Sequence, residues 1–266
     1  MSVVRVSVLL PVGPQSPYLS ETLQSLKRQT INQWELIIVL DGNVNANREI
    51  VDSAGLEVPV VVIEHTTPQG IARSLNAALH RASGDLIARI DADDICYPER
   101  FAKQITQFDL DEELMLLGTS ANIIGASGEL AGKRIVPTQD AVLRRRLIWR
   151  NSFIHPSVMF RKNAAILLGG YNIHCTRTED YELWLRLALC GKVNNLSEPL
   201  IGYRVHAGQH TTGRQGISAN ESKALLKMKL QLAKQGGTPQ WFARLIHFIW
   251  EWNRTPHNFF PSRTAR

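Results

Sequence analysis

The stretch LIARIDADDICYPERF, residues 86–101, decides how the rest of the sequence is interpreted. An apolar run typical of a buried strand passes directly into three carboxylates, Asp91, Asp93 and Asp94. The acids could cap a helix near Pro98, because aspartate accepts hydrogen bonds from the first N–H groups of a helix. They could equally hold Mg²⁺ or Mn²⁺, hard cations that share their coordination with substrate phosphates. The spacing alone leaves both interpretations open.

The composition is that of an ordinary globular protein. The chain has 266 residues, of which 44% are hydrophobic and 20% charged, enough for one large domain or a domain with an appended subdomain. Its net charge of +6 would suit an anionic partner: a nucleic acid, a membrane surface or a phosphorylated substrate. Three scattered cysteines, Cys96, Cys175 and Cys190, lack CxxC spacing. They indicate buried thiols in a reducing cytosol, neither a disulfide framework nor a zinc site.

Strand and helix patterns alternate through the first hundred residues and predict an α/β fold. β-branched and apolar runs unbroken by polar alternation predict strands that are buried on both faces, which is typical of a mostly parallel sheet flanked by helices. The expected strands are residues 4–11, 34–42, 58–65 and 85–90, and the expected helices are 20–30, 46–55 and 69–84.

Polar residues at the carboxyl ends of these strands are the first functional signal. Ligands of open α/β sheets bind outside the carboxyl ends of the strands. Pro11, Asp41 and Asp91 end three of the predicted strands, so they are expected at one edge of the sheet. Two acidic strand ends at one edge favour a functional site over a simple helix cap.

The second half is less regular. Residues 114–125 predict a strand pair or one extended segment with a turn at Gly125, residues 138–151 and 178–191 predict helices, and residues 194–206 predict strands. This half is expected to complete the sheet and to form the second wall of a cleft. The glycine-rich segment 207–216, which contains His210, is a candidate lid.

Several motifs in a fixed order, over roughly residues 4–206, resemble glycosyltransferase family 2, whose members are inverting enzymes with a GT-A fold. These are VSVLLPV, QTINQWELIIVLDGN, GIARSLNAAL, ASGDLIARIDADDICYPERF, HPSVMFRK, GGYN, TEDYELWLRLALCGKV and YRVH. Two departures concern the nucleotide pocket. Leu40 replaces the first of two paired acids, and PVGPQSPY, residues 11–18, replaces the usual PVYN.

The resemblance implies a donor site and a metal site. Asp41 would contact the uracil or ribose of a nucleotide sugar, and Pro11 would shape that pocket through its backbone. Arg73 would approach the nucleotide or its diphosphate, or is simply a solvated helix arginine. A second group concerns Mn²⁺ or Mg²⁺: Asp93 as ligand, Asp91 on the ribose or the water shell of the metal, Asp94 as a third candidate, and His206 near the metal or diphosphate.

The acidic pair that opens segment 178–191 supplies the expected chemistry. An inverting transfer needs a base that removes the proton of the acceptor hydroxyl. Asp180 matches the base of the family, while Glu179 would orient the acceptor or cap the helix. His155 would line the acceptor cleft, but a hydrogen-bonded structural role is the alternative for His155 and also for His206. Without the resemblance, acids in a first turn are explained by the helix dipole alone.

The expected function is a metal-dependent, inverting transfer from a UDP-sugar to a hydroxyl of a glycan or lipid-linked acceptor in surface polysaccharide biosynthesis. A sugar-phosphate nucleotidyltransferase is disfavoured because PVGPQSP is no glycine-rich phosphate loop, and a dehydrogenase because GxGxxG is absent. A catalytically inactive nucleotide-sugar-binding protein is the remaining alternative. No nucleic acid partner is expected.

The domain division predicted is a transferase domain over residues 1–215, with a donor half (1–110) and an acceptor half (111–215), followed by a helical, basic and aromatic extension over 216–266. An aromatic helix with basic flanks suits an anionic membrane surface. It could equally cover the core or form a dimer contact. A cytoplasmic protein is expected, with or without peripheral contact to the membrane.

Overall fold

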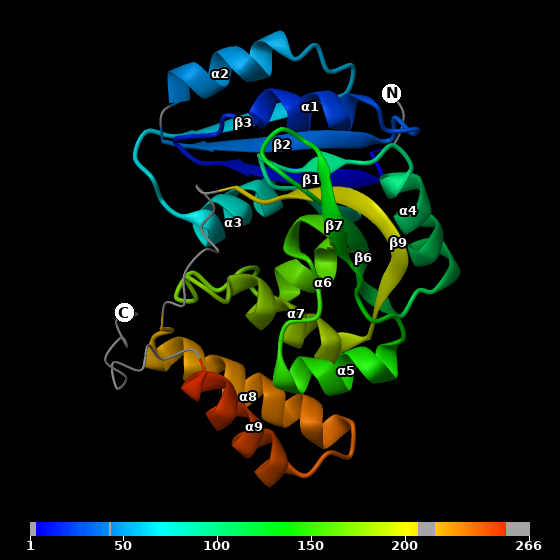
Figure 1. The fold of residues 1–266 in the computed structure, drawn as a ribbon, viewed down its shortest axis with the longest axis vertical. Coiled ribbons are helices and arrows are strands. Elements are labelled where there is room, and N and C mark those ends of the chain that lie inside the picture. The colour runs from blue at the N-terminus through cyan, green and yellow to red at the C-terminus, as the bar shows by residue number, and fades with distance from the viewer. Residues whose placement is uncertain (1–3, 43, 207–215, 254–266) are drawn as a thin grey trace, which may run out of the picture.

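The computed structural model in Figure 1 describes residues 4–42, 44–206 and 216–253. The strands are β1 (Val6–Val12), β2 (Trp34–Asp41), β3 (Val60–His65), β4 (Leu86–Arg89), β5 (Ile95–Cys96), β6 (Leu114–Ile124), β7 (Leu130–Arg134), β8 (Met159–Arg161) and β9 (Lys192–Arg204). The helices are α1 (Leu19–Lys27), α2 (Val44–Ser53), α3 (Ile71–Arg81), α4 (Arg100–Leu110), α5 (Asp140–Trp149), α6 (Lys162–Leu167), α7 (Glu179–Cys190), α8 (Ala219–Gln235) and α9 (Gln240–Trp252).

These strands form one sheet in the order β3-β2-β1-β4-β8-β6-β9-β5, with β7 paired to β6. The first four run parallel, as the alternating pattern predicts. β8 is antiparallel to both β4 and β6, and β9 is parallel to β6. The α/β class is therefore confirmed, and the complete sheet is mixed, because the second half adds antiparallel strands. The two predicted halves share this sheet.

Helices cover both faces of the sheet, and each face has its own apolar core. Side chains of α1, α2 and α4 pack on one face, and those of α3, α5, α6 and α7 on the other. Strand β2, which lies between β3 and β1, is buried at all eight positions, which explains its unbroken apolar run. Cys96 and Cys175 lie in the interior, whereas Cys190 is exposed, so the prediction of buried thiols fails for Cys190.

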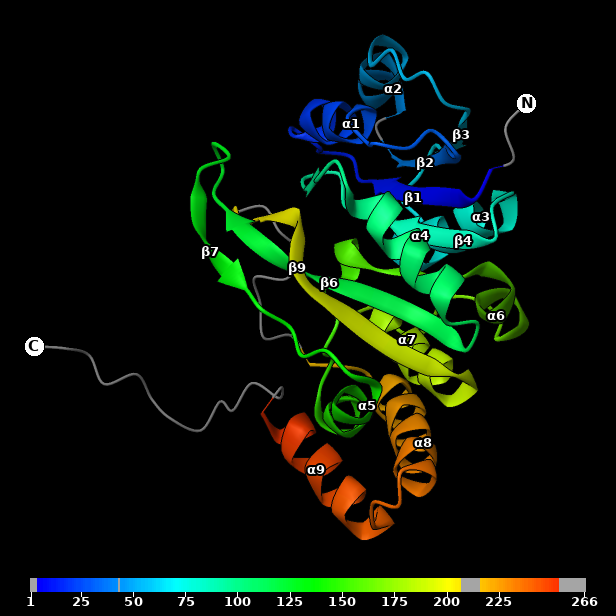
Figure 2. The same ribbon diagram turned by 90° about the vertical axis from the view of Figure 1, so that its right-hand side faces the viewer.

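Segment 114–125 forms one strand, not a pair, and the predicted turn follows it. Gly125 N–H donates to the carbonyl of Glu129 at 2.9 Å, and Gly128 has φ +85°, a conformation that favours glycine. The chain then returns as β7. The strands expected in 194–206 are likewise one long strand, β9, which lies beside β6 along its length (Figure 2).

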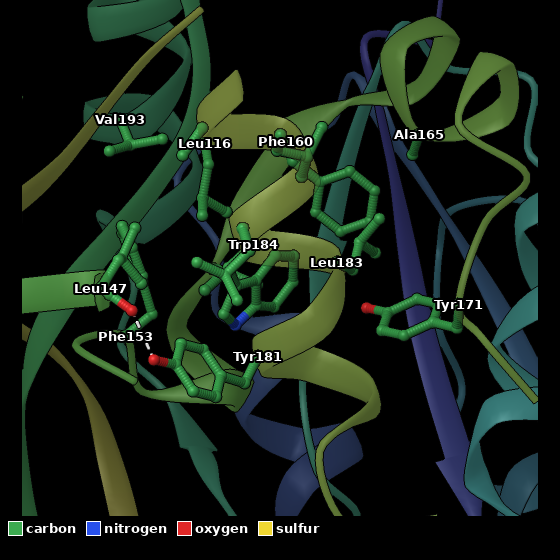
Figure 3. Close-up of a cluster of buried hydrophobic side chains, with 14 of the residues drawn as sticks. Leu116, Leu147, Phe153, Phe160, Ala165, Tyr171, Tyr181, Leu183, Trp184 and Val193 are labelled. Atoms are coloured by element: carbon green, nitrogen blue, oxygen red, sulfur yellow. Dashed lines mark hydrogen bonds between the residues drawn. The ribbon is translucent and has the colours of Figure 1, made fainter. Parts of the chain in front are cut away.

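The second core is organised around Trp184 of α7, which is completely buried (Figure 3). The rings of Phe153, Phe160 and Tyr171 lie 6.4, 5.7 and 6.2 Å from it, centroid to centroid. On the preceding turn of α7, Tyr181 donates its hydroxyl proton to the carbonyl of Leu147 on α5. These contacts fix the direction and the depth of α7 against the sheet.

The C-terminal helices α8 and α9 belong to this second core. Leu225, Leu232, Ala233, Ala243 and Trp250 are buried in the same cluster as Trp184. Helix α8 begins with a capping box, Ser218 with Glu221. Glu221 also accepts the N–H of Arg177 at 3.0 Å, just before α7. One face of the extension therefore covers the core, which was one of the alternatives predicted from the sequence. Within the described ranges, no helix is long and apolar enough to cross a membrane.

A buried polar network joins α8 to α9. The ammonium of Lys229, which is fully buried, lies 3.3 Å from Nδ1 of His247 and 4.3 Å from the ring centroid of Trp250. Because an ammonium only donates, we assign Nδ1 as the acceptor and Nε2 as the donor to Ser222 Oγ, at 2.9 Å. The Ser222 hydroxyl in turn donates to Glu251. Burial, followed by the charge of Lys229, lowers the pKa of His247 to about 4.

This network predicts a measurable pH dependence of stability. The unfolded chain protonates His247 near pH 6.5, whereas the native chain does so only near pH 4, so stability is lost as the pH falls through this window. In His247→Asn, which keeps an acceptor for Lys229, urea unfolding at pH 7, 5.5 and 4.5 should show a smaller loss, by up to about 3 kcal/mol. His80→Asn, at an exposed position of α3, is the control. Equal losses in wild type and His247→Asn would contradict the assignment.

Candidate active site

The carboxyl ends of β1, β2 and β4 lie at one edge of the sheet, as predicted. Pro11 pairs with Val39 of β2, and Leu9 pairs with Arg89 of β4, so the segments after these strands emerge together. Chain direction therefore brings Pro11, Asp41 and Asp91 to the same edge, although about 80 residues separate the first from the last.

Asp41 binds the loop that leads into α3. Its Oδ1 accepts the N–H of Gln69 at 2.7 Å and lies 3.0 Å from Nδ1 of His65, and its Oδ2 accepts the N–H of Gly70 at 2.9 Å. The carboxylate thus fixes the start of α3, where Arg73 is exposed in the first turn. Pro11 and Asp41 therefore lie at the ends of adjacent strands, and Asp41 holds the loop from which the helix of Arg73 begins.

The three acids of the opening motif converge after β4. Ligand oxygens of Asp91, Asp93 and Asp94 all lie within 4.8 Å of one another. Nε2 of His206 lies 2.9 Å from Oδ2 of Asp93, so the histidine predicted for this site does reach it. Asp91 and Asp93 are partly exposed, whereas Asp94 is completely buried.

Asp94 shows how strongly negative charge is concentrated here. Its Oδ1 accepts the N–H of Arg204 at 2.8 Å, while its buried Oδ2 has no hydrogen-bond partner among the described residues. Burial, with the charges of Asp91 and Asp93, raises the pKa of Asp94 well above its ordinary value. A divalent cation would relieve this repulsion and give the orphaned oxygen a partner. The donor set, all oxygen with one imidazole, fits Mg²⁺ or Mn²⁺.

Arg204, in the YRVH motif, holds this cluster together, and no role was predicted for it from the sequence. Its guanidinium is buried and donates to the carbonyls of Asp93 and Ala126, at 2.8 and 2.9 Å, and to Glu21 at 2.7 Å. It also stacks on the ring of Tyr18, 4.2 Å from the centroid. Arg204 therefore attaches the end of β9, and with it His206, to the acidic loop.

Helix α7 presents its first turn to the same region. Asp180 is partly exposed; its Oδ2 accepts from Asn151 Nδ2 at 2.7 Å and its Oδ1 from the N–H of Tyr181 at 2.6 Å. Glu179 is only 8% exposed, and its Oε2 has no hydrogen-bond partner among the described residues. Of the two acids, Asp180 is the one that solvent and substrates can reach.

Electrostatic interactions connect α7 with the acidic cluster. Burial, then the charge of Asp180, raises the pKa of Glu179 to about 7, and Asp91 adds to this rise. The pKa of Tyr171 is raised mainly by burial and further by Asp180, Glu179 and Asp91. Such mutual effects require short separations through a medium with little water. The charges of the first turn of α7 and of the end of β4 therefore act on one another.

Arg89 lies between these two groups and is the second residue that the sequence reading missed. Its side chain is 1% exposed and forms an ion pair with Asp91. Its Nε and Nη1 have no hydrogen-bond partners among the described residues. Its charge lowers the pKa values of Asp94 and Glu179. The signal was visible: a charged residue inside an apolar strand, in LIARID.

His155 belongs to the inner wall of this region. Its ring lies 5.9 Å from that of Tyr171 and 5.7 Å from that of Trp184, centroid to centroid. Burial, and then the nearby charge of Arg89, holds the pKa of His155 well below its ordinary value. Its surroundings are those of a neutral packing residue. The candidate lid 207–215, with His210, lies outside the described residues.

The raised pKa of Glu179 predicts a stabilising substitution. Between pH 4.5 and 7 the unfolded chain ionises this carboxyl while the native state resists, so the native state loses stability as the pH rises. Glu179→Gln should raise the unfolding free energy at pH 8 by about 1–3 kcal/mol and leave it unchanged at pH 4. Glu49→Gln, at an exposed position of α2, is the control for both pH values. A variant no more stable than wild type at pH 8 would refute the prediction.

Comparisons with known proteins agree on a single class. The family model described as Glycosyl transferase family 2 matches residues 7–168. The amylovoran biosynthesis glycosyltransferase AmsE of Erwinia amylovora is 34% identical over 222 residues, which are 82% of each chain.

Solved structures show the same fold. S. aureus TarS 1–349 in complex with UDP-GlcNAc superposes with a TM-score of 0.72 over 94% of this chain and 72% of its own, at 19% identity. The mannosyltransferase PcManGT of Pyrobaculum calidifontis, in complex with GDP-Man and Mn²⁺, gives a TM-score of 0.60 at 16% identity, over 94% and 70% of the two chains. The expected GT-A type of α/β fold is confirmed. From its match to the family model and to its curated relative, the chain belongs to glycosyltransferase family 2.

Proposed function

We propose that this glycosyltransferase is an inverting, metal-dependent enzyme that transfers a sugar from a UDP-sugar to a hydroxyl of a glycan or lipid-linked acceptor. One observation supports the proposal: Asp180, a partly exposed carboxylate of α7, and Asp91 of the acidic cluster after β4 both act through their charges on Glu179 and Tyr171. A single displacement needs these two elements, a base for the acceptor and an acidic cluster that can hold a metal for the diphosphate.

Asp180 is the proposed base. Each of its oxygens accepts a hydrogen bond from a fixed donor, Asn151 or the Tyr181 amide, and these two bonds orient the carboxylate. It would take the proton of the acceptor hydroxyl as that oxygen attacks the anomeric carbon. Glu179, buried beside it, has the proposed role of supporting the position of the acceptor.

The acidic cluster is proposed for the donor side. Asp91, Asp93 and Asp94, with His206, would hold Mn²⁺ or Mg²⁺. A bound divalent cation would neutralise the negative charge that develops on the departing nucleoside diphosphate. Asp41, Pro11 and Arg73 would bind the nucleotide at the neighbouring strand ends. The TarS complex supports UDP-GlcNAc chemistry on this fold, and the PcManGT complex supports Mn²⁺.

The relatives also support a biological setting. The name of AmsE places that protein in amylovoran biosynthesis, and we propose that this chain likewise acts in bacterial surface polysaccharide synthesis, in the cytoplasm. If its acceptor is lipid-linked, the reaction takes place at the inner surface of the cytoplasmic membrane.

Thermal unfolding with a panel of nucleotide sugars, with and without Mn²⁺, tests the donor and metal assignments together. We expect one UDP-sugar to raise the melting temperature, and the rise to require the metal. Asp93→Asn should abolish the metal-dependent part, and Asp109→Asn, an exposed acid outside the site, should not. Stabilisation by none of the nucleotide sugars would refute the proposal. Binding without any transfer would identify an inactive nucleotide-sugar-binding protein.

A further inference from the structure

Helix α9 has two apolar faces, of which only one is used by the core. Ala243, Ile246, His247 and Trp250 are buried against the rest of the protein. The opposite face is exposed and equally apolar. Its residues, at spacings of three and four that form one stripe, are Trp241, Phe242, Leu245, Phe248, Ile249 and Trp252, exposed between 40% and 67%.

We call this stripe the outer face of α9. Other exposed apolar residues, such as Leu110, Leu130 and Leu167, lie on separate elements. Single residues of that kind need no explanation, but a contiguous patch on a soluble surface marks an interaction site. Four of the six side chains of the outer face are aromatic, and two of these are tryptophans.

Charge identifies the partner. Residues 216–266 contain eight lysines and arginines and two glutamates, an excess of six, which equals the net charge of the whole chain. The first 215 residues are therefore neutral overall. Within the described part of the extension, Lys223, Lys227, Lys234 and Arg244 are exposed. A charge asymmetry of this kind, next to an aromatic stripe, points to an anionic surface.

We infer that the outer face of α9 binds an anionic lipid surface, with the helix parallel to the membrane plane. Trp241 and Trp252 begin and end the stripe, about 16 Å apart along the axis at 1.5 Å per residue. Tryptophan prefers the boundary between acyl chains and headgroups, and lysine and arginine attract anionic lipids. A symmetric contact between two copies would instead bring the basic extensions together, and their charges would repel.

The same helix connects this surface with the site. Trp250, on the inner face, lies 6.2 Å from Tyr181 by ring centroids, and Tyr181 directly follows Asp180. Binding through α9 would therefore fix the orientation of α7 relative to the membrane. The inference rests on the proposed function in one respect only. If the acceptor is lipid-linked, membrane binding through α9 would bring the site close to it.

Co-sedimentation with vesicles tests the inference without donor, metal or acceptor, so it stays decisive if the proposed transfer fails. We expect the full chain to bind phosphatidylcholine vesicles containing 30% phosphatidylglycerol at least about tenfold more tightly than pure phosphatidylcholine vesicles. The variant Trp241→Ser/Leu245→Ser/Phe248→Ser should lose this binding and keep the melting temperature of the wild type. The matched control, Leu110→Ser/Leu130→Ser/Leu167→Ser, removes three exposed apolar residues elsewhere and should bind as the wild type does.

Two results would overturn the inference. One is a wild type that does not sediment with the anionic vesicles, and the other is an α9 variant that binds as well as its control. Light scattering tests the alternative that a second copy of the chain covers the outer face. A wild-type dimer that becomes monomeric in the α9 variant, with no vesicle binding in either protein, would assign the face to a contact between two copies.

Discussion

Replacing Asp180 with asparagine is expected to slow sugar transfer by about 100- to 10,000-fold, the usual contribution of a general base. Asparagine cannot take the proton of an acceptor hydroxyl at neutral pH. The substitution also turns one of two accepting oxygens into a donor, which would face either Asn151 Nδ2 or the N–H of Tyr181. The expected loss of stability is about 1 kcal/mol, too little to unfold the protein.

Donor binding separates this outcome from a general collapse of the site. In Asp180→Asn, stabilisation by the UDP-sugar with Mn²⁺ should equal that of the wild type, while initial rates of product formation fall. Glu182→Gln is the matched control, because Glu182 stands in the same first turn of α7 but pairs with Arg186. Its transfer rate should remain within about tenfold of wild type. If Asp180→Asn transfers at the parental rate, another group is the base.

The sheet and its active edge could be predicted because each depends on local sequence. Strands buried on both faces appear as unbroken apolar runs, and the parallel order places Asp41 and Asp91 at one edge whatever the loops do. The mixed character of the full sheet could not be predicted this way. The three-residue β8 lies between β4 and β6, and nothing in so short a segment determines its neighbours.

The roles of Arg204 and of the outer face of α9 could not be predicted from the sequence for a different reason: they depend on distant parts of the chain. Arg204 contacts Asp93 across 111 positions and Glu21 across 183. Helix α9 is apolar on almost every side, so only its packing on α5 and α8 decides which residues remain exposed. Sequence identified the helix; tertiary structure assigned its two faces.

Arg89→Met is expected to produce the second large effect, a loss of transfer of about 100-fold or more. The substitution keeps most of the side-chain volume and removes one buried positive charge from between Asp91 and the first turn of α7. Asp91 then loses the ion pair that it forms with Arg89. The same charge lowers the pKa values of Asp94 and Glu179, so both should rise in the variant.

The pH profile distinguishes this electrostatic role from a structural one. Since the carboxylates of the site ionise at higher pH without Arg89, the acidic limb of kcat/KM should move upward by about one unit or more. Arg89→Lys, which keeps the charge, should retain the wild-type limb even if its rate is reduced. Arg161→Met removes an arginine that donates, among the described residues, to the backbone carbonyls of Phe108, Asp111 and Leu114. It should cost stability without moving the acidic limb.

An upward shift of the acidic limb of kcat/KM would indicate an electrostatic role for Arg89. A buried guanidinium with two nitrogens, Nε and Nη1, lacking hydrogen-bond partners among the described residues is costly to retain, and packing alone would be served as well by methionine. Arg89 therefore has to contribute something that an apolar side chain cannot: its positive charge holds the pKa values of Asp94 and Glu179 lower than they would be without it. If Arg89→Met loses transfer but the acidic limb of its kcat/KM profile does not shift, Arg89 acts only through packing. A shifted limb in Arg89→Met and not in Arg89→Lys would establish it as the counter-charge on which both halves of the site depend.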